Sequence, residues 1–329
     1  MYNAELFLGS SQMDVTGAGK RIVAAGMLAL AAFALTGCSS DNNPATPPSA
    51  APPTSKLGTT VSNITYCTGA GIAQTLDFYY PTQASSALYP VVVYIHGGQL
   101  IMGSKNAPAG SPADMWKSTL TPQGYAFVSI NYRLGPANKF PAMIEDAKCA
   151  IRYLRANAAT YNINPNRIGV TGTSSGGYLA ALVALSTSPG LEGNGGWPGV
   201  SSRVQAAVVE YGADMDLRQP NYSAAEVEGR TQAYPQPVPA DITASGTVIL
   251  HVSSDDPPFL FFHGEKDMLV DRQDNIDINN ALKAVGVSSN FTLVLNAGHG
   301  WDNAFGPLSP TWDQILQTEL TFFNTYLKN

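Results

Sequence analysis

A serine flanked by glycines is the strongest chemical signal in this sequence of 329 residues. The segment from Gly172 to Gly177 reads G-T-S-S-G-G and contains a G-x-S-x-G motif centred on Ser174. A nucleophilic serine stands on a sharp, strained turn, where neighbouring glycines let the strand and helix backbones approach without Cβ clashes. An isolated match also occurs in ordinary loops, but this one lies between an expected strand and an expected helix. We therefore predict Ser174 as a nucleophile, with Thr173 and Ser175 out of register.

Such a serine needs a base, and the chain has four histidines. His299 lies in the segment N-A-G-H-G-W directly after the last expected strand, and a loop at a strand end leaves an imidazole free to reach a neighbouring strand. The alternative for His299 is a surface histidine in a glycine turn. His251 lies in an apolar stretch and His263 ends a strand, so both are interpreted as packed or structural side chains.

The imidazole in turn needs a carboxylate that orients it and stabilises its charged form. Asp267 lies in the segment H-G-E-K-D just after the penultimate expected strand, and it is the first choice. The chain order Ser174, Asp267, His299 is the order of α/β-hydrolases. The competing acidic residues are Glu265, Asp271, Asp214 and Asp216.

A second glycine turn could supply hydrogen-bond donors to a developing oxyanion. His96, Gly97 and Gly98 follow an apolar run, and their turn could present the N–H groups of Gly97 and Gly98. The N–H of Ser175, the residue after the nucleophile, would complete an oxyanion hole. His96 itself is interpreted as structural, holding the loop through hydrogen bonds.

Strands and helices alternate along most of the chain, which is typical of a mostly parallel sheet with helices on both faces. Ala142–Ala158 has apolar residues at helical spacing, whereas 218–245 has no clear period and is expected to form a loop or a partial lid. The expected strands are Val61–Cys67, Thr75–Tyr80, Val91–Ile95, Tyr125–Asn131, Arg167–Gly172, Val204–Tyr211, Pro258–Phe262 and Phe291–Leu295. The other expected helices are Ser175–Leu185, Gln273–Val285 and Thr311–Leu327.

The composition excludes some classes of protein. Charged residues make up 13% and hydrophobic residues 44% of the chain, whereas disordered chains are rich in charge and poor in apolar residues. The formal net charge is −6 and no basic run occurs, which argues against a nucleic-acid partner. The histidines and cysteines lack metal-ligand spacing, so neither a metal nor an organic cofactor is expected.

Several motifs in order resemble one enzyme family. The segments are Val93–Gly98, Ile130–Leu134, Phe140–Ala142, Gly172–Gly177, Pro257–Leu260 and His263–Asp267. Together they resemble the bacterial feruloyl-esterase-like carboxylesterases, a branch similar to the hormone-sensitive-lipase group of α/β-hydrolases. The resemblance covers residues 64–327 and implies an α/β-hydrolase fold with a mostly parallel eight-stranded sheet.

The resemblance also implies a serine esterase with Ser174, Asp267 and His299 as its triad. Asp146 matches a position expected to support the loop around the active site. Two residues depart from the family pattern: Gln99 stands where relatives often have a small residue, and Ser175 where Ala is usual. Both border the expected oxyanion hole, so the mechanism transfers better than the substrate preference.

The N-terminus resembles a bacterial lipoprotein signal. Lys20 and Arg21 precede an uncharged, apolar run at 22–36, which Gly37 and Cys38 follow. This run is short for a membrane span of about 20 residues. The expected organisation is a signal peptide at 1–37, a lipidated Cys38 with a proline-rich linker at 38–56, and a catalytic domain at 57–329. Translation is expected to start at Met13. The alternative is a buried helix in which Cys38 is incidental.

Two cysteines remain in an exported protein, where disulfides persist. A bridge between Cys67 and Cys149 is possible, and the alternative is two separate buried thiols.

The expected activity is hydrolysis of short-chain or aryl esters, such as acetyl or feruloyl groups on plant polysaccharides, through an acyl-enzyme intermediate. Two rivals stay open: a serine peptidase on the same fold, and a lipid-anchored protein that binds ligands without catalysis. The expected location is a bacterial membrane, on the periplasmic or cell-surface side, reached through a lipid anchor. The oligomeric state is not predicted.

Overall fold

The computed structural model describes residues 56–212, 217–218 and 223–329. The expected signal peptide, Cys38 and most of the linker lie outside the described residues, as do Asp214 and Asp216. Among the described residues, no helix is long and apolar enough to cross a membrane.

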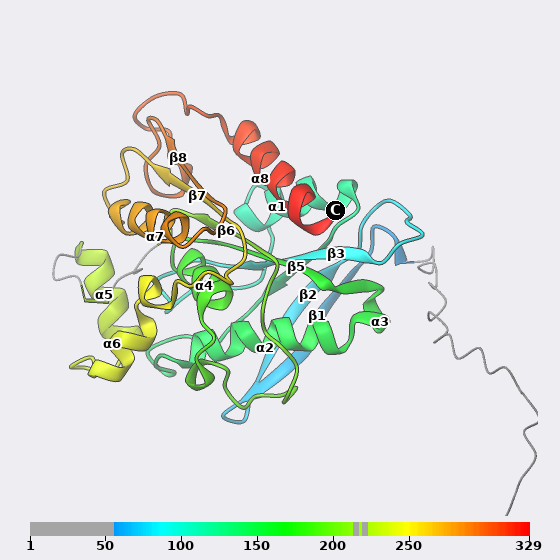
Figure 1. Ribbon diagram of the computed structural model, residues 1–329, viewed down its shortest axis with the longest axis horizontal. Helices are drawn as coiled ribbons and strands as arrows, with labels where there is room; N and C mark the ends of the chain where they lie inside the picture. Colours follow the sequence, from blue (N-terminus) through cyan, green and yellow to red (C-terminus); the bar gives the residue numbers. More distant parts are fainter. Residues whose placement is uncertain (1–55, 213–216, 219–222) are drawn as a thin grey trace, which may run out of the picture. The chain divides into compact units, whose positions relative to one another are not determined.

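The described residues form one eight-stranded sheet (Figure 1), which confirms the predicted fold class. Its strands are β1 (Thr60–Gly69), β2 (Ile72–Tyr79), β3 (Tyr89–Ile95), β4 (Ala126–Ile130), β5 (Ile163–Thr173), β6 (Ala206–Glu210), β7 (Phe259–Gly264) and β8 (Ser289–Val294). They lie in the order β1-β2-β4-β3-β5-β6-β7-β8. β2 runs antiparallel to β1 and β4, and the pairs from β4 to β8 are parallel.

Helices cover both faces of the sheet. Figure 1 shows α1 (Pro112–Leu120) and α8 (Trp312–Leu327) on one side and α2 (Ala142–Ala156) and α4 (Ser175–Leu185) on the other. β3 is buried along its whole length, which explains why its sequence is an unbroken apolar run instead of an alternating one. The remaining helices are α3 (Ala158–Tyr161), α5 (Ala224–Ala233), α6 (Ala240–Gly246) and α7 (Gln273–Ala284).

The structure corrects several predicted boundaries. β5 begins at Ile163, which pairs with Tyr89 of β3, and it includes the Pro165–Asn166 segment as an irregularity where the register shifts before Ile168. The Asn166 N–H donates to Asn164 Oδ1 at 2.9 Å there, so the expected turn is kept inside the strand. The helix expected over 142–158 ends at Ala156, and α3 follows it.

Two helical regions differ from the expectation as well. The structure forms α5 inside 218–245, and α6 begins in this stretch and ends at Gly246, so helices form where a loop was one of the two expectations. The partial lid stays a prediction. The structure also forms α1, which the sequence analysis missed although Ser111 caps it by accepting a hydrogen bond from the N–H of Asp114.

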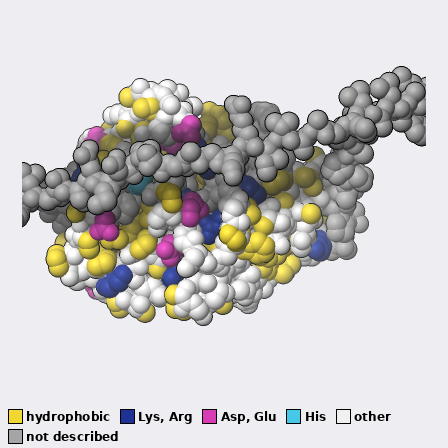
Figure 2. Space-filling view, turned by 60° about the horizontal axis from the view of Figure 1, so that its bottom comes forward, with side chains coloured by type: hydrophobic (Ala, Val, Ile, Leu, Met, Phe, Trp, Pro, Cys, Tyr) yellow, Lys and Arg dark blue, Asp and Glu magenta, His cyan; other side chains and the backbone are white. Residues whose placement is uncertain are grey.

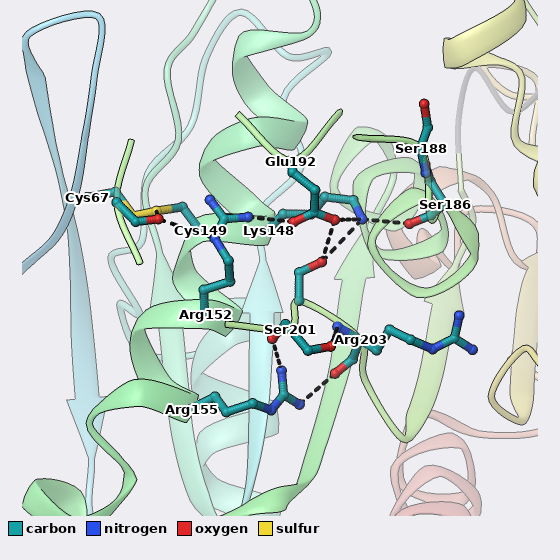
Figure 3. A network of polar contacts seen from close by, with 12 residues as sticks. Cys67, Lys148, Cys149, Arg152, Arg155, Ser186, Ser188, Glu192, Ser201 and Arg203 are labelled. Atoms are coloured by element: carbon teal, nitrogen blue, oxygen red, sulfur yellow. Dashed lines mark hydrogen bonds and ion pairs between the residues drawn. A yellow bond between two sulfur atoms is a disulfide. The ribbon is translucent and has the colours of Figure 1, made fainter. Parts of the chain in front are cut away.

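A disulfide links β1 to α2. Cys67 and Cys149 are bonded, with their Cα atoms 6.3 Å apart, within the range that a disulfide can span. Beside it the Lys148 ammonium and the Arg152 guanidinium bind the same Glu192 carboxylate at 2.8 and 2.6 Å (Figure 3). These contacts tie the 186–203 segment to α2. Lys148 also donates to the Ser186 carbonyl at the C-terminal end of α4, whereas Ser174 precedes the N-terminal end of that helix.

Charge is dispersed over the surface seen in Figure 2. On that face the described basic and acidic side chains lie singly or in small groups among apolar and uncharged ones.

Candidate active site

Ser174 lies at the turn between β5 and α4, in a backbone conformation that L-residues seldom adopt. Its φ and ψ are 54° and −126°, and such strain persists only where surrounding contacts enforce it. The Ser174 N–H donates to the carbonyl of Glu210 at 3.0 Å, and the Ser174 carbonyl accepts from the N–H of Tyr178 at 3.1 Å. The turn therefore holds the Ser174 side chain at the carboxyl end of the parallel strands.

Close packing explains the glycines of the motif. A Cβ at Gly176 would overlap the carbonyl oxygen of Ile95, and a Cβ at Gly97 would lie 2.9 Å from the carbonyl oxygen of Thr173. The start of α4, the end of β3 and the glycine turn after β3 thus meet without side chains between them.

His299 lies between Ser174 and Asp267. Its Nδ1 is 2.8 Å from Asp267 Oδ2 and its Nε2 is 3.0 Å from Ser174 Oγ. In the neutral tautomer whose Nδ1–H donates a hydrogen bond to the Asp267 carboxylate, Nε2 is unprotonated and can accept the serine proton. The structure therefore brings together the three residues that the sequence analysis selected, each from a different strand end.

The Asp267 carboxylate is nearly inaccessible to solvent and is surrounded by donors. Oδ1 accepts from the N–H groups of Leu269 and Val270 at 2.9 and 3.0 Å. Oδ2 is 3.2 Å from His263 Nε2, in addition to its contact with His299. Burial raises the pKa of Asp267, but the hydrogen bonds from His263, His299 and Val270 outweigh it, so the pKa lies well below its usual value. Asp267 is therefore an anion at neutral pH.

His263, expected from the sequence to be a packed or structural side chain, contacts the candidate site through Asp267. It is fully buried, its Nδ1 faces the Asn275 amide at 3.3 Å, and its Nε2 also lies 3.2 Å from the carbonyl of Val270. His263 thus orients the carboxylate. Its spacing of four residues before Asp267 was the signal available in the sequence.

His96 anchors the glycine turn that is expected to form the oxyanion hole. His96 stacks on Tyr132 with ring centroids 4.4 Å apart, and its Nδ1 is 2.7 Å from the Gly97 carbonyl. Burial lowers the pKa of His96 to about 4, so the ring is neutral at pH 7 and Nδ1 donates to Gly97. This arrangement agrees with a structural role for His96.

Ser175 has a role that the sequence analysis did not foresee. Its Oγ accepts a hydrogen bond from the Leu100 N–H at 3.2 Å. Ser175 thus ties the glycine turn of Gly97 and Gly98 to the start of α4. Gly97 lies against the Ser174 turn, where a Cβ on Gly97 would be 3.2 Å from the Ser174 Cβ.

Asp146 supports the next loop, as expected from its position. Its carboxylate accepts from both the backbone N–H and the Nε of Arg133, each at 2.8 Å. Burial raises the pKa of Asp146 and the Arg133 contacts only partly offset this. Gly135, two residues after Arg133, donates from its N–H to the Leu100 carbonyl at 2.9 Å. The ion pair therefore supports the chain that follows Gly98.

The competing candidates for the acid and the base make other contacts in the structure. Glu265 accepts from the Asn296 N–H at 3.1 Å, Asp271 accepts from the Gln273 N–H at 2.9 Å, and His251 Nε2 is 2.9 Å from the Ser245 carbonyl. Asp214 and Asp216 are outside the described residues. Among the described residues, no group of three or more His, Cys, Asp and Glu side chains is arranged to hold a metal ion.

One family model and several known proteins are similar to this chain. The family model described as BD-FAE matches residues 76–282. Esterase LipQ of Mycobacterium tuberculosis is 32% identical over 254 residues, an alignment covering 74% of this chain and 58% of LipQ. Esterase LipC of the same organism is 30% identical, covering 70% of this chain and 57% of LipC. The chain thus spans just over half the length of these curated relatives.

A solved structure matches over a larger share. The truncated form of a carbohydrate esterase from gut microbiota superposes with a TM-score of 0.68 at 28% identity, covering 85% of this chain and 100% of that chain. The sheet described above and this likeness identify the fold as that of the α/β-hydrolases.

Acid should weaken the folded protein through Asp267. Because the pKa of Asp267 is below 3.8 in the folded state, its anion contributes stability above pH 3.8 that is lost as the pH falls through the folded-state value. We expect Asp267→Asn to lower the free energy of unfolding by about 2 kcal/mol at pH 7. That difference should shrink between about pH 5 and pH 2, as urea unfolding at each pH would measure. A difference that stays constant with pH would contradict the lowered pKa.

Proposed function

The chain belongs to the BD-FAE family, and from this premise we propose that it is a serine carboxylesterase. The observation that carries the proposal is the continuous hydrogen-bonded chain from Asp267 through His299 to Ser174. Enzymes with this chain of contacts transfer acyl groups through a covalent intermediate.

The proposed reaction begins when Ser174 Oγ attacks the ester carbonyl carbon. His299 Nε2 takes the hydroxyl proton, and the carbonyl oxygen becomes an oxyanion that the N–H groups of Gly97, Gly98 and Ser175 stabilise. His299 then gives the proton to the leaving alcohol, and an acyl-enzyme is left. Water repeats the sequence, with His299 again as base, and releases the acid. Asp267 remains an anion throughout and stabilises the imidazolium.

Reactivity of Ser174 separates the esterase from a protein that only binds. We expect Ser174→Ala to lower the turnover of p-nitrophenyl acetate by at least about 10⁴-fold, because the covalent route is lost. A fluorophosphonate probe should label the wild type at Ser174 and leave the variant unlabelled. Thr173→Ser is a matched control that keeps a hydroxyl one residue away. A wild type that resists the probe would favour the binding protein, and activity retained without Ser174 would refute the mechanism.

The proposed substrates are short acyl or aryl esters, including acetyl or feruloyl groups on polysaccharides. The similar solved structure is that of a carbohydrate esterase, which supports a sugar-linked ester. The loops after Gly98, Asp267 and His299 each expose a large apolar side chain: Met102, Met268 and Phe305 are 57%, 81% and 48% exposed. Exposed apolar side chains of this kind can contact an aryl or acyl group.

The packing of α5 supports a short acyl group. A Cβ at Gly229 of α5 would lie 2.9 Å from the Cβ of Gln99, so α5 closes the space on that side of the glycine turn. Gln99, the residue that departs from the family pattern, is part of this contact.

A panel of esters tests the substrate class. We expect kcat/KM to be highest for p-nitrophenyl acetate, methyl ferulate or acetylated xylan and to fall at least about tenfold by p-nitrophenyl octanoate, because each methylene that cannot be accommodated costs roughly 1 kcal/mol. Ser174→Ala supplies the background rate for every substrate. Highest activity on octanoate would contradict a short acyl site, and preferential cleavage of prolyl peptides would support the peptidase.

We propose in addition that the protein is exported and anchored to a bacterial membrane through lipid on Cys38. The apolar run at 22–36 and the small residues around Cys38 support this, and the disulfide between Cys67 and Cys149 is in keeping with an oxidising compartment.

Lipidation can be tested in bacteria that express the full chain. We expect the wild type to incorporate labelled palmitate and to enter the detergent phase of a Triton X-114 separation, because acyl chains bury apolar surface in the detergent. Cys38→Ser should take up no label and stay in the aqueous phase, whereas Ser39→Ala should behave like the wild type. Equal partitioning of the wild type and Cys38→Ser would contradict the anchor.

A further inference from the structure

Glu210 is a fully buried carboxyl at the end of β6, directly behind the candidate active site. Its Oε1 accepts a hydrogen bond from Trp116 Nε1 of α1 at 2.7 Å. Its Oε2 accepts one from Trp301 Nε1 at 2.8 Å. Its backbone carbonyl accepts the N–H of Ser174. One residue is thus bonded to the nucleophile turn through its main chain and to the histidine turn through its side chain.

Trp301 is part of the turn that carries His299. The turn spans His299–Trp301, and both Gly300 and Trp301 have positive φ, of 71° and 63°. Such a turn does not repeat the hydrogen bonds of a helix or strand, so outside contacts must fix its position. The indole of Trp301 provides one of these contacts through Glu210.

An aromatic stack connects the same elements. Tyr211 follows Glu210 in the chain, and its ring lies edge-on to both His299 and Trp301, with centroids 4.9 and 4.8 Å apart. The imidazole therefore rests against a ring whose other neighbour is the indole held by Glu210. A shift of Trp301 would be transmitted to His299 through the turn and through Tyr211.

Burying the Glu210 carboxylate costs free energy that burying an apolar side chain at the same position would not cost. Removing a charge from water without compensation costs several kcal/mol, and strand ends in cores are ordinarily apolar. The two indole N–H groups offset part of this cost by donating to the Glu210 carboxylate, and these hydrogen bonds fix the position of the carboxylate relative to the indoles. Packing alone would not call for this residue type.

A second buried carboxyl completes the environment of Glu210. Glu319 of α8 lies beside it, and its oxygens meet no N–H or O–H donor in the described part of the chain. Burial, together with the neighbouring Glu210 carboxyl, raises the pKa of Glu319 well above its usual value. Burial also raises the pKa of Glu210, to about 7, while the indoles of Trp301 and Trp116 oppose that rise.

We propose that Glu210 is a positioning residue for the proposed esterase reaction, holding the His299 turn in register with Ser174 through its hydrogen bond to the Trp301 indole. Glu210 does not touch the substrate. It acts through Ser174 and His299, which contact the substrate in the proposed reaction. The inference therefore rests on the proposed function.

Two tryptophans on the same carboxylate give a matched pair of variants. Trp301→Phe and Trp116→Phe each remove one N–H donor from Glu210 and keep an aromatic ring in the same apolar layer. Only Trp301 belongs to the histidine turn, whereas α1 carries none of the candidate site residues. If Glu210 merely satisfied buried indoles, both variants would have the same effect.

We expect Trp301→Phe to lower kcat for p-nitrophenyl acetate about tenfold with KM unchanged, because displacements of the order of 1 Å in a catalytic group can cost up to about 100-fold. The labelling rate of Ser174 by the fluorophosphonate probe should fall in parallel. Trp116→Phe should keep kcat within about twofold of the wild type. Urea unfolding of both variants would show whether their losses of stability match.

The two proposals fail in different ways. If the wild type turns over esters but both variants lose the same fraction of kcat, or if Trp301→Phe keeps the wild-type kcat, Glu210 is a packing residue and the esterase stands. A rise in KM with kcat unchanged would also overturn positioning, because it would place Trp301 in substrate binding. A wild type without turnover or labelling would overturn the proposed function and, with it, this inference.

Discussion

The candidate site depends on the close approach of three backbones at the carboxyl ends of β3 and β5. The glycine turn after β3 and the first turn of α4 touch without side chains between them, because Gly97 and Gly176 carry none. Ser174 lies next to this contact in its strained conformation, with its Oγ 3.0 Å from His299 Nε2. Everything else in the site is placed relative to that turn, so the sheet must hold β3 and β5 in fixed register.

Polar side chains then fix the loops that the sheet leaves free. Arg133 and Asp146 hold the chain after β4, and Ser175 holds Leu100 after the glycine turn. Each of these bonds joins a loop to a helix or strand that packs against the core. Loops are the least stable parts of a fold, so buried hydrogen bonds at their bases restrict movement where the position of a donor matters.

The sequence predicted the elements well and the contacts between side chains poorly. Continuous apolar runs such as β3 predicted strands because burial on both faces leaves no other pattern, and helix α4 begins at Ser175 and ends at Leu185 as expected. β5 begins two residues before Pro165 because Ile163 pairs with Tyr89 of β3, a contact between distant segments that the local turn residues do not indicate. Helices α5 and α6 lack a clear apolar period, so only tertiary packing reveals them.

For the candidate site as well, the sequence indicated the individual residues but not the side-chain contacts that hold them. Ser174, Asp267 and His299 could be selected because their motifs are local and each follows a strand. The links from His263 to Asp267 and from Glu210 to Trp301 join side chains whose relation depends on chain geometry. Asp267 and Glu210 also show why composition alone is insufficient: burial opposes ionisation of both. Several donors leave Asp267 with a lowered pKa, whereas two indoles leave that of Glu210 raised. The balance between burial and the donors around each carboxylate therefore decides which of the two is an anion beside the imidazole.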